Sequence, residues 1–217
     1  MRNFVRLTLL FLAGFGFAQS DLYWAIANND ALTAWKLTQP GELISLPAVA
    51  DLSWAVSRGS GEVFDVLSYR GAPVAGIDES GRNLLFEASL AGRLDLFRKI
   101  ALSGARLDQV DFSGLSLVHA AAQSVQTVMV PFLLRNGLPP AARSELGVTP
   151  LMLASQEGRL ENVQVLLNWG ANPEDQDYLG RSVLWYANRG KYPEMLSLLN
   201  REVGQAESVP NDGDPLP

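Results

Sequence analysis

One fixed spacing, the step from Gly81 to Gly114, constrains the fold of this chain more than any other feature. We call this spacing the repeat period. One alanine and three glycines recur at it. Three series are complete: Ala55, Ala88, Ala121 and Ala154; Gly71, Gly104, Gly137 and Gly170; and Gly81, Gly114, Gly147 and Gly180. The fourth series is Gly59, Gly92 and Gly158, and it lacks its member at position 125. Self-similarity at a period of this length is the mark of stacked supersecondary units, each of which buries its apolar face against its neighbours.

The repeat at residues 147–179 predicts two short helices. Thr149-Pro150 predicts the first helix start, because threonine caps exposed N–H groups and proline suits the first helical position. Ala154 is small enough for two helices to approach closely, and Gly158 permits a tight reversal between them. A second helix then presents one apolar stripe and ends at Gly170 in a left-handed cap.

This pattern resembles the ankyrin repeat, which runs G-x-T-P-L-H-x-A-A, then a second helix, G-A and a hairpin. The resemblance implies an all-α fold, an ankyrin-repeat α-solenoid of about six units with short β-hairpin loops and atypical capping units at both ends. The chain is then expected to consist of a repeat domain over 19–203 and a disordered acidic tail over 204–217. The expected units are 21–47, 48–80, 81–113, 114–146, 147–179 and 180–203.

Two units depart from the pattern. In 114–146, Val125 replaces the glycine between the helices, and Pro131 is predicted to lie inside the second helix and to kink it. The departure is either a neutral irregularity or a change of curvature that shapes a groove. The last unit keeps its register only if one residue is deleted near Gly190.

The segment 1–18 predicts a secretory signal peptide. Arg2 and Arg6 precede an apolar run, "LTLLFLAGFGF", and Gly16 and Ala18 are small residues at the −3 and −1 positions of a cleavage site. The alternative is an uncleaved anchor, but an apolar run of this length spans only about 18 Å as a helix, which is short for a bilayer. We therefore expect an exported protein, periplasmic or extracellular, of bacterial type.

The charge of the chain argues against nucleic acid and membrane partners. The predicted signal peptide carries two of the 17 basic residues and none of the 23 acidic ones, so its removal leaves a net charge of −8. Such a chain repels phosphate backbones and anionic lipid. The chain has no cysteine and one histidine, which excludes disulfides, thiolate metal sites and a pair of histidine ligands.

No arrangement of residues predicts catalysis, a metal site or a cofactor. His119 occupies the histidine slot of the resembled family, where it supports a turn, and other units carry Phe86, Met152 or Trp185 there. The loop acids cluster in two groups, Glu174, Asp175 and Asp177, and Asp108 and Asp111, and are expected to be solvated turn residues and helix caps. A hydrolase that uses these carboxylates is the remaining enzymatic alternative.

The resemblance implies that the concave face of hairpin tips and first helices binds a partner protein. The residues carried over to this role are Arg82, Phe112, Leu115, Leu146, Val148, Tyr178, Leu179 and Arg181. Several are large and apolar where a solvated loop would be polar. They either form one exposed patch or tuck against the neighbouring hairpin.

We expect a monomeric, non-enzymatic protein-binding module. The alternative is a secreted effector or enzyme inhibitor that also acts by binding. Trp24 and Trp54 stand in the first helices of the first two units, where they are expected to cover the exposed end of the stack; a binding ledge of two tryptophans is the other interpretation.

Overall fold

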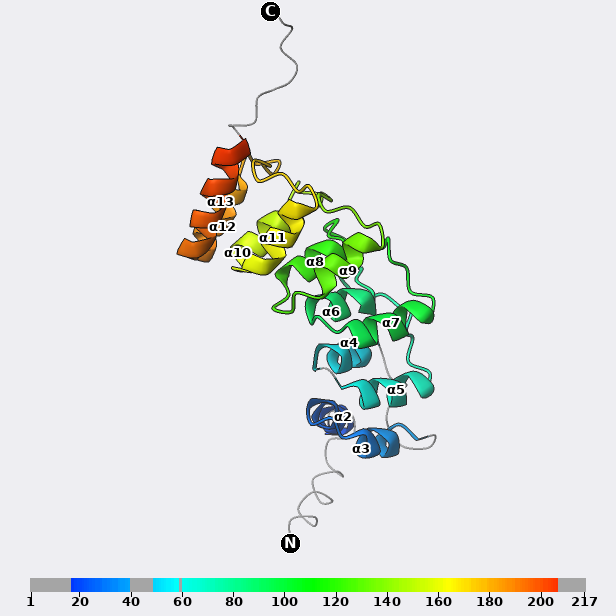
Figure 1. Cartoon of the computed structure of the whole chain (residues 1–217). Coiled ribbons are helices and arrows are strands. Elements are labelled where there is room, and N and C mark those ends of the chain that lie inside the picture. The colour runs from blue at the N-terminus through cyan, green and yellow to red at the C-terminus, as the bar shows by residue number, and fades with distance from the viewer. Residues whose placement is uncertain (1–16, 40–48, 59, 207–217) are drawn as a thin grey trace, which may run out of the picture. The chain divides into compact units, whose positions relative to one another are not determined.

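The computed structural model describes residues 17–39, 49–58 and 60–206. Within these ranges the chain forms twelve α-helices in six pairs, and its only β-pairings are isolated bridges between Ile77 and Asn83 and between Gln176 and Ser182 (Figure 1). The expected all-α helix-pair repeat is therefore confirmed, with hairpin loops reduced to turns. The predicted signal peptide lies outside these ranges except for residues 17 and 18, which begin the first described helix.

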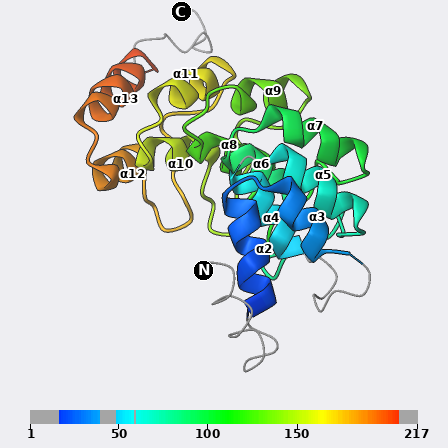
Figure 2. The same cartoon turned by 90° about the horizontal axis from the view of Figure 1, so that it is seen from below.

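The chain divides into two compact units at Leu107. The N-terminal unit contains α2 (Phe17–Ala27), α3 (Ala31–Leu37), α4 (Val49–Arg58), α5 (Gly61–Tyr69), α6 (Leu84–Leu90) and α7 (Leu94–Leu102). Within it α4 packs between α2 and α6, and α3 packs beside α5 (Figure 2).

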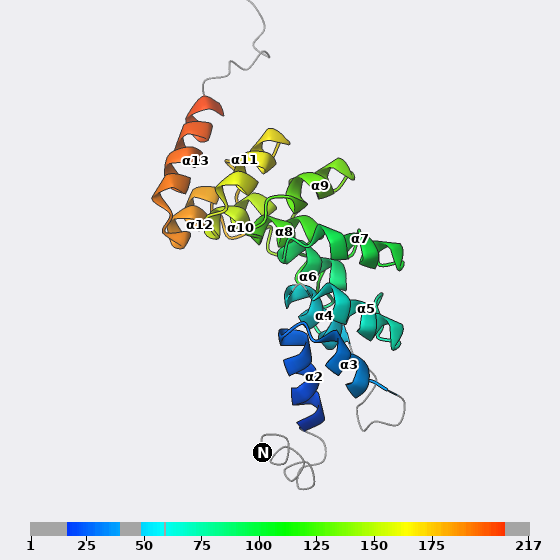
Figure 3. The same cartoon turned by 60° about the horizontal axis from the view of Figure 1, so that its bottom comes forward.

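The C-terminal unit repeats this arrangement. It contains α8 (Leu117–Gln123), α9 (Met129–Arg135), α10 (Pro150–Gln156), α11 (Leu160–Asn168), α12 (Val183–Gly190) and α13 (Pro193–Ala206). Within it α10 packs between α8 and α12, and α9 packs beside α11 (Figure 3). In both units the first helices of successive pairs therefore lie next to one another.

The periodic alanines lie in the first helices of the pairs, which pack against one another. Ala55, Ala88, Ala121 and Ala154 are fully buried, and so are Ala25 and Ala187 at the corresponding places in the first and last pairs. A larger side chain at these positions would force the helices apart, because protein interiors are packed as densely as organic crystals. The cap at Thr149 also forms as expected, with the Thr149 hydroxyl accepting from the Met152 N–H and Pro150 opening α10.

The predicted kink at Pro131 is wrong. α9 begins at Met129, later than the register of α7 and α11 requires, so Pro131 occupies the third position of the helix. N–H groups in the first turn of a helix have no partner in that helix, so proline there removes no hydrogen bond. The late start follows from Ser124, whose extended backbone ends α8 without a glycine.

The last pair also differs from the expectation. No residue is deleted near Gly190, because α12 and α13 each begin one full repeat period after α10 and α11. Lys191 takes the left-handed conformation, at φ 62°, that Gly158 takes in the preceding repeat. α13 continues to Ala206, into the range predicted as tail, and the rest of that range lies outside the described residues.

Candidate functional site

The turns that join successive repeats share one construction. A residue at the start of each turn donates its N–H to the carbonyl four residues later, and its side chain accepts two N–H groups of the same turn. These residues are Asp78, Asp111, Ser144 and Asp177, which again follow one another at the repeat period. Each turn therefore has a rigid tip, since the side chain satisfies backbone donors that a loop would otherwise leave to water.

The expectation that the loop acids are solvated is wrong for Asp111 and Asp177. Both are buried, and their carboxylates lie inside the turns. Asp111 and Asp177 recur at the repeat period together with Asp78 and Ser144, and this spacing is the sequence signal that could have identified them as acceptors inside the turns.

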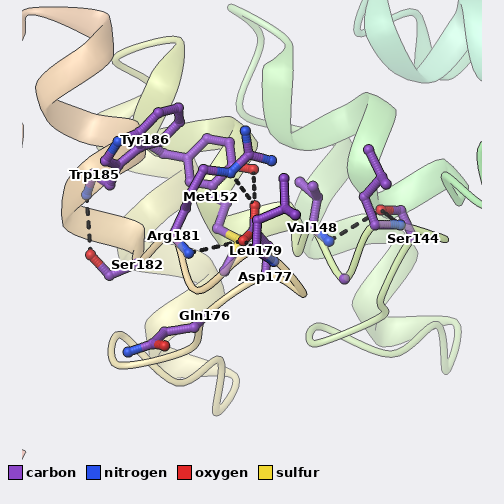
Figure 4. A network of polar contacts seen from close by, with 12 residues as sticks. Ser144, Val148, Met152, Gln176, Asp177, Leu179, Arg181, Ser182, Trp185 and Tyr186 are labelled. Carbon is purple, nitrogen blue, oxygen red and sulfur yellow. Dashed lines mark hydrogen bonds and ion pairs between the residues drawn. The ribbon is translucent and has the colours of Figure 1, made fainter.

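Asp177 anchors the most elaborate of these turns (Figure 4). Its Oδ1 accepts the N–H groups of Leu179 and Arg181 at 3.0 and 2.9 Å. Its Oδ2 lies 2.5 Å from Arg181 Nε and 2.7 Å from the Tyr186 hydroxyl, which donates to it. All the acceptor capacity of this carboxylate is directed into the turn and the helix behind it.

The electrostatics of this network oppose proton transfer at neutral pH. Burial raises the pKa of Asp177, but the hydrogen bonds from Arg181, Tyr186 and Leu179 outweigh it and lower this pKa to about 2. Burial and the bond to Asp177 raise the pKa of Tyr186 to about 12. A group that titrates so far from neutrality is a poor general acid or base.

Asp175 is also engaged, because its Oδ1 lies 2.6 Å from the Arg143 guanidinium. No cluster of three potential metal-ligating side chains occurs in the described residues. Of the loop acids on which the hydrolase alternative rested, Asp111 and Asp177 are turn acceptors and Asp175 is an ion-pair partner, while Glu174 and Asp108 are exposed.

Hydrogen bonds join the tips of the three turns of the C-terminal unit, which begin at Asp111, Ser144 and Asp177. The Glu145 N–H donates to the Ser113 carbonyl at 2.9 Å, and one repeat later the Tyr178 N–H donates to the Leu146 carbonyl at 3.0 Å. Arg143 strengthens the second junction by donating to the carbonyls of Gly147 and Gln176 at 3.2 and 2.8 Å. The tips therefore form one continuous row held by main-chain hydrogen bonds.

Four of the predicted binding residues lie exposed on this row. Their exposed fractions are 67% for Phe112, 58% for Leu146, 68% for Tyr178 and 69% for Leu179. We call these four the apolar tip row. The Tyr178 ring lies against Gly147, where an added Cβ would come within 2.7 Å of a ring carbon. Tyr178 thus packs on the neighbouring tip and still exposes most of its surface.

The remaining predicted residues have other positions. Val148 is buried, which removes it from a contact surface, and its carbonyl is used inside the fold. Leu115 and Arg181 are half-buried, and Arg181 is held by Asp177. Arg82 belongs to the N-terminal unit and is not part of the tip row.

His119 has the turn-supporting role implied by the resemblance. Its Nδ1 accepts from the Ser116 N–H at 3.0 Å, so the ring proton lies on Nε2, which donates to the Val148 carbonyl at 2.9 Å. Burial lowers the pKa of His119, although the Val148 carbonyl and Asp111 favour the protonated ring. The neutral ring connects α8 to the turn of the next repeat.

Trp24 and Trp54, the two tryptophans expected to cover the end of the stack, are both partly exposed. Tyr23 packs edge-on against Trp54 with ring centroids 6.3 Å apart, and the Arg58 guanidinium lies 4.5 Å from the Trp54 ring centroid.

Among the helices of the described ranges, none combines the length and apolar character needed to cross a membrane.

Comparison with known proteins gives the family. A model described as ankyrin repeats in three copies matches residues 85–177 and 118–208, which together cover more than half of the chain. An ankyrin repeat-containing protein of Treponema pallidum (strain Nichols) is 30% identical over 147 residues, which are 66% of this chain and 49% of that protein.

Two further relatives come from other kinds of organism. An IkB-like protein of African swine fever virus (isolate Tick/Malawi/Lil 20-1/1983) is 31% identical over 121 residues, 51% of either chain. The Caenorhabditis elegans homolog of transient receptor potential cation channel subfamily A member 1 is 31% identical over 119 residues, 54% of this chain and 10% of that one. The chain spans between a tenth and about half of the length of these relatives. The helix-pair repeat, the periodic turn residues and the family match together place this chain in the ankyrin-repeat family.

Proposed function

We propose that this chain is a non-enzymatic module that binds a partner protein through the apolar tip row. The observation that carries the proposal is the exposure of Phe112, Leu146, Tyr178 and Leu179 on tips joined by main-chain hydrogen bonds. A contiguous exposed apolar surface typically marks a site of association. Rigid tips also reduce the ordering cost of binding, because little conformational freedom remains to be lost.

The membership of the ankyrin-repeat family supports this proposal, because such repeats generally act as interaction modules. A partner surface with its own apolar patch fits the tip row best. The acidic balance of the chain disfavours nucleic acid as the partner. A monomer that presents the tip row to a different protein is the simplest arrangement.

The test is affinity capture on immobilised full-length chain, starting from an extract of the native compartment. We expect the double substitution Phe112→Ala and Leu179→Ala to abolish recovery of the partner. These two side chains are exposed, so the substitutions leave folding intact. Val125→Ala is the matched control, because Val125 is an exposed apolar residue of the same unit outside the tips. Equal recovery with the double variant would rule out the tip row as the binding surface.

We further propose that the chain is exported and that residues 1–18 are removed. The support is the basic start, the apolar run and the small residues Gly16 and Ala18. Mass spectrometry of the intact protein isolated from its native source tests this. We expect a mature chain that begins at Gln19, and a chain that retains residues 1–18 would contradict cleavage.

A further inference from the structure

Trp185 occupies a position of the repeat at which the other repeats of the C-terminal unit carry a buried side chain. The equivalent residues His119 and Met152 are both fully buried. His119 is bonded to the turn of the following repeat, through the Val148 carbonyl. Trp185 stands on α12, the first helix of the last described pair, and 39% of its surface is exposed. The end of the C-terminal unit therefore carries a large aromatic side chain where earlier repeats have a buried one.

Basic side chains flank this tryptophan. The guanidinium of Arg181 lies 4.9 Å from the Trp185 ring centroid, and that of Arg189 lies 5.5 Å from it. Figure 4 shows Trp185 and Arg181 beside the turn of Asp177. Such stacking keeps guanidinium groups close to the ring and leaves their edges available to acceptors.

Two of the three basic residues of this surface form no ion pair in the described part of the chain. Arg181 is paired with Asp177, but no carboxylate of the described residues lies within ion-pair distance of Arg189 or Lys191. The stretch 180–193 contains three basic residues and no acidic one, in a chain of net charge −6. Arg189 and Lys191 are both exposed. A local excess of positive charge beside an exposed aromatic ring selects for a ligand that is both acidic and apolar.

We propose that Trp185, Arg189 and Lys191 form a second docking site, for an acidic segment of a partner protein. An apolar side chain of that segment lies on the Trp185 ring, and two of its carboxylates pair with Arg189 and with Lys191 at the end of α12. The site is separate from the apolar tip row and does not depend on its function. We call it the α12 end site.

Fluorescence anisotropy with a labelled peptide tests the proposal on the full chain. The probe is Gly-Ser-Asp-Asp-Phe-Asp-Asp-Ser-Gly, and the matched probe has asparagine in place of each aspartate. We expect the acidic probe to bind and the asparagine probe to bind with an affinity lower by about tenfold or more, since two to four charge-assisted contacts are lost. Failure of the acidic probe to bind, or equal binding of both probes, overturns the proposal.

Variants then locate the binding. Arg189→Gln with Lys191→Gln, and separately Trp185→Leu, are each expected to weaken binding of the acidic probe about tenfold. Arg135→Gln, at an exposed arginine on α9, is the control and should leave the affinity unchanged. Near-UV circular dichroism checks that each variant is folded. Unchanged affinity in both site variants, or an equal loss in the control, overturns the assignment.

Two other occupants would be recognised in the same experiment. The chain's own last residues are acidic and are therefore one alternative occupant. If the occupant is a partner segment, Asp212→Asn with Asp214→Asn in the full chain leaves the affinity for the probe unchanged. A gain in affinity of about tenfold would show that these residues compete for the site and would overturn the assignment to a partner segment. Sedimentation of the wild-type chain should show a monomer. A dimer that dissociates in the Arg189→Gln and Lys191→Gln variant would replace the partner with a second copy.

Discussion

At the scale of single residues, the turn acceptors explain why the tips are rigid. Asp78, Asp111, Ser144 and Asp177 each satisfy two backbone donors that would otherwise need water. A carboxylate does this more strongly than a hydroxyl, because hydrogen bonds to a charged acceptor are shorter and stronger. The tip row therefore depends on Asp111, Ser144 and Asp177, which are themselves buried.

We predict that Asp177→Asn lowers stability at neutral pH and flattens its dependence on pH in acid. The native pKa of Asp177 is about 2, against an ordinary value of 3.8. The stabilisation is complete above the ordinary pKa and is lost as the pH falls toward about 2, because the unfolded chain takes up the proton first. Urea unfolding at neutral pH and across this window measures it.

Asp175→Asn provides the comparison for Asp177. Asp175 forms an ion pair with Arg143, which is more than a third exposed, and such surface pairs contribute about 0–1 kcal/mol. Its substitution should therefore change stability less at neutral pH. If the Asp177→Asn chain kept the full acid dependence of the wild type, the lowered pKa would not belong to this carboxylate.

We predict that Gly147→Ala destabilises the chain more than Gly170→Ala. Both glycines have positive φ, at 75° and 86°, so a Cβ costs about 1–2 kcal/mol at either position. At Gly147 the Cβ also meets the Tyr178 ring, whereas nothing lies within 4 Å of the site at Gly170. Thermal unfolding compares the two variants, and Tyr178→Ala should recover part of the loss at Gly147 only. Equal losses would contradict the packing of Tyr178 on this tip.

At the scale of helices, the irregular repeat is stabilised by its neighbour. α8 ends in extended backbone at Ser124, which leaves carbonyls of its last turn without the usual glycine cap. The buried Asn162 amide of α11 donates to the carbonyls of Ala121, Ala122 and Ser124 at 3.0–3.3 Å. Arg159 Nε donates to the Gln123 carbonyl at 2.9 Å. The departure at Val125 is thus matched by polar residues one repeat later.

We predict that Asn162→Leu costs about 1–3 kcal/mol of unfolding free energy, because buried carbonyls lose their donor. Leucine fits the register, since the equivalent residue of α7 is the buried Leu96. Met195→Leu at the equivalent position of α13 is the control, and a swap of this kind usually costs less than about 1.5 kcal/mol. Denaturant titrations measure both, and a smaller loss for Asn162→Leu than for the control would refute the capping role.

We predict opposite sensitivities to proline at two equivalent positions. Gln164 of α11 is the register equivalent of Pro131, but it lies at the fifth position of its helix, where its N–H is bonded within the helix. Gln164→Pro should therefore cost about 3 kcal/mol or more. Pro131→Ala should change stability only slightly, because Pro131 lies in the first turn of α9. Far-UV circular dichroism during thermal unfolding compares them, and a large loss for Pro131→Ala would show that its ring is needed elsewhere.

At the scale of the whole molecule, each unit has its own core and its own kind of exposed surface. The N-terminal unit exposes the aromatic groups around Trp54, while the C-terminal unit exposes the apolar tip row and the α12 end site. The stability of a repeat protein is approximately the sum of terms within repeats and between neighbours. A core substitution should therefore be felt mainly near its own repeat.

We predict that Leu166→Ala weakens the C-terminal unit selectively. Leu166 is fully buried in α11, and truncation of such a leucine typically costs about 2–5 kcal/mol. Amide hydrogen exchange should show a larger loss of protection in α9–α12 than in α2–α5. Leu52→Ala in α4, also fully buried, should show the reverse distribution. A uniform loss of protection would mean that the chain unfolds as one cooperative body.

The sequence predicted the repeat, the pairing of helices and the burial of the periodic alanines, because these depend on spacing along one chain. It placed Phe112, Leu146, Tyr178 and Leu179 in the turns but left open whether these side chains are exposed or packed on the neighbouring hairpin, and only the structure decided that they are exposed. Spacing could not predict the burial of Val148, the late start of α9 or the network around Asp177. These features depend on contacts between residues of different elements.

The distinction has one physical origin. Local conformation and amphipathic pattern are set by neighbours within a turn or two, so a periodic sequence describes them well. Whether a polar group is solvated depends on what packs against it, such as the Tyr186 hydroxyl at Asp177 or the Asn162 amide at Ser124. Trp185 shows the same limit, because its slot is buried in earlier repeats and exposed only where no described repeat follows. The pattern of residues thus set the positions of the helices along the chain, and three-dimensional packing decided which side chains remain exposed.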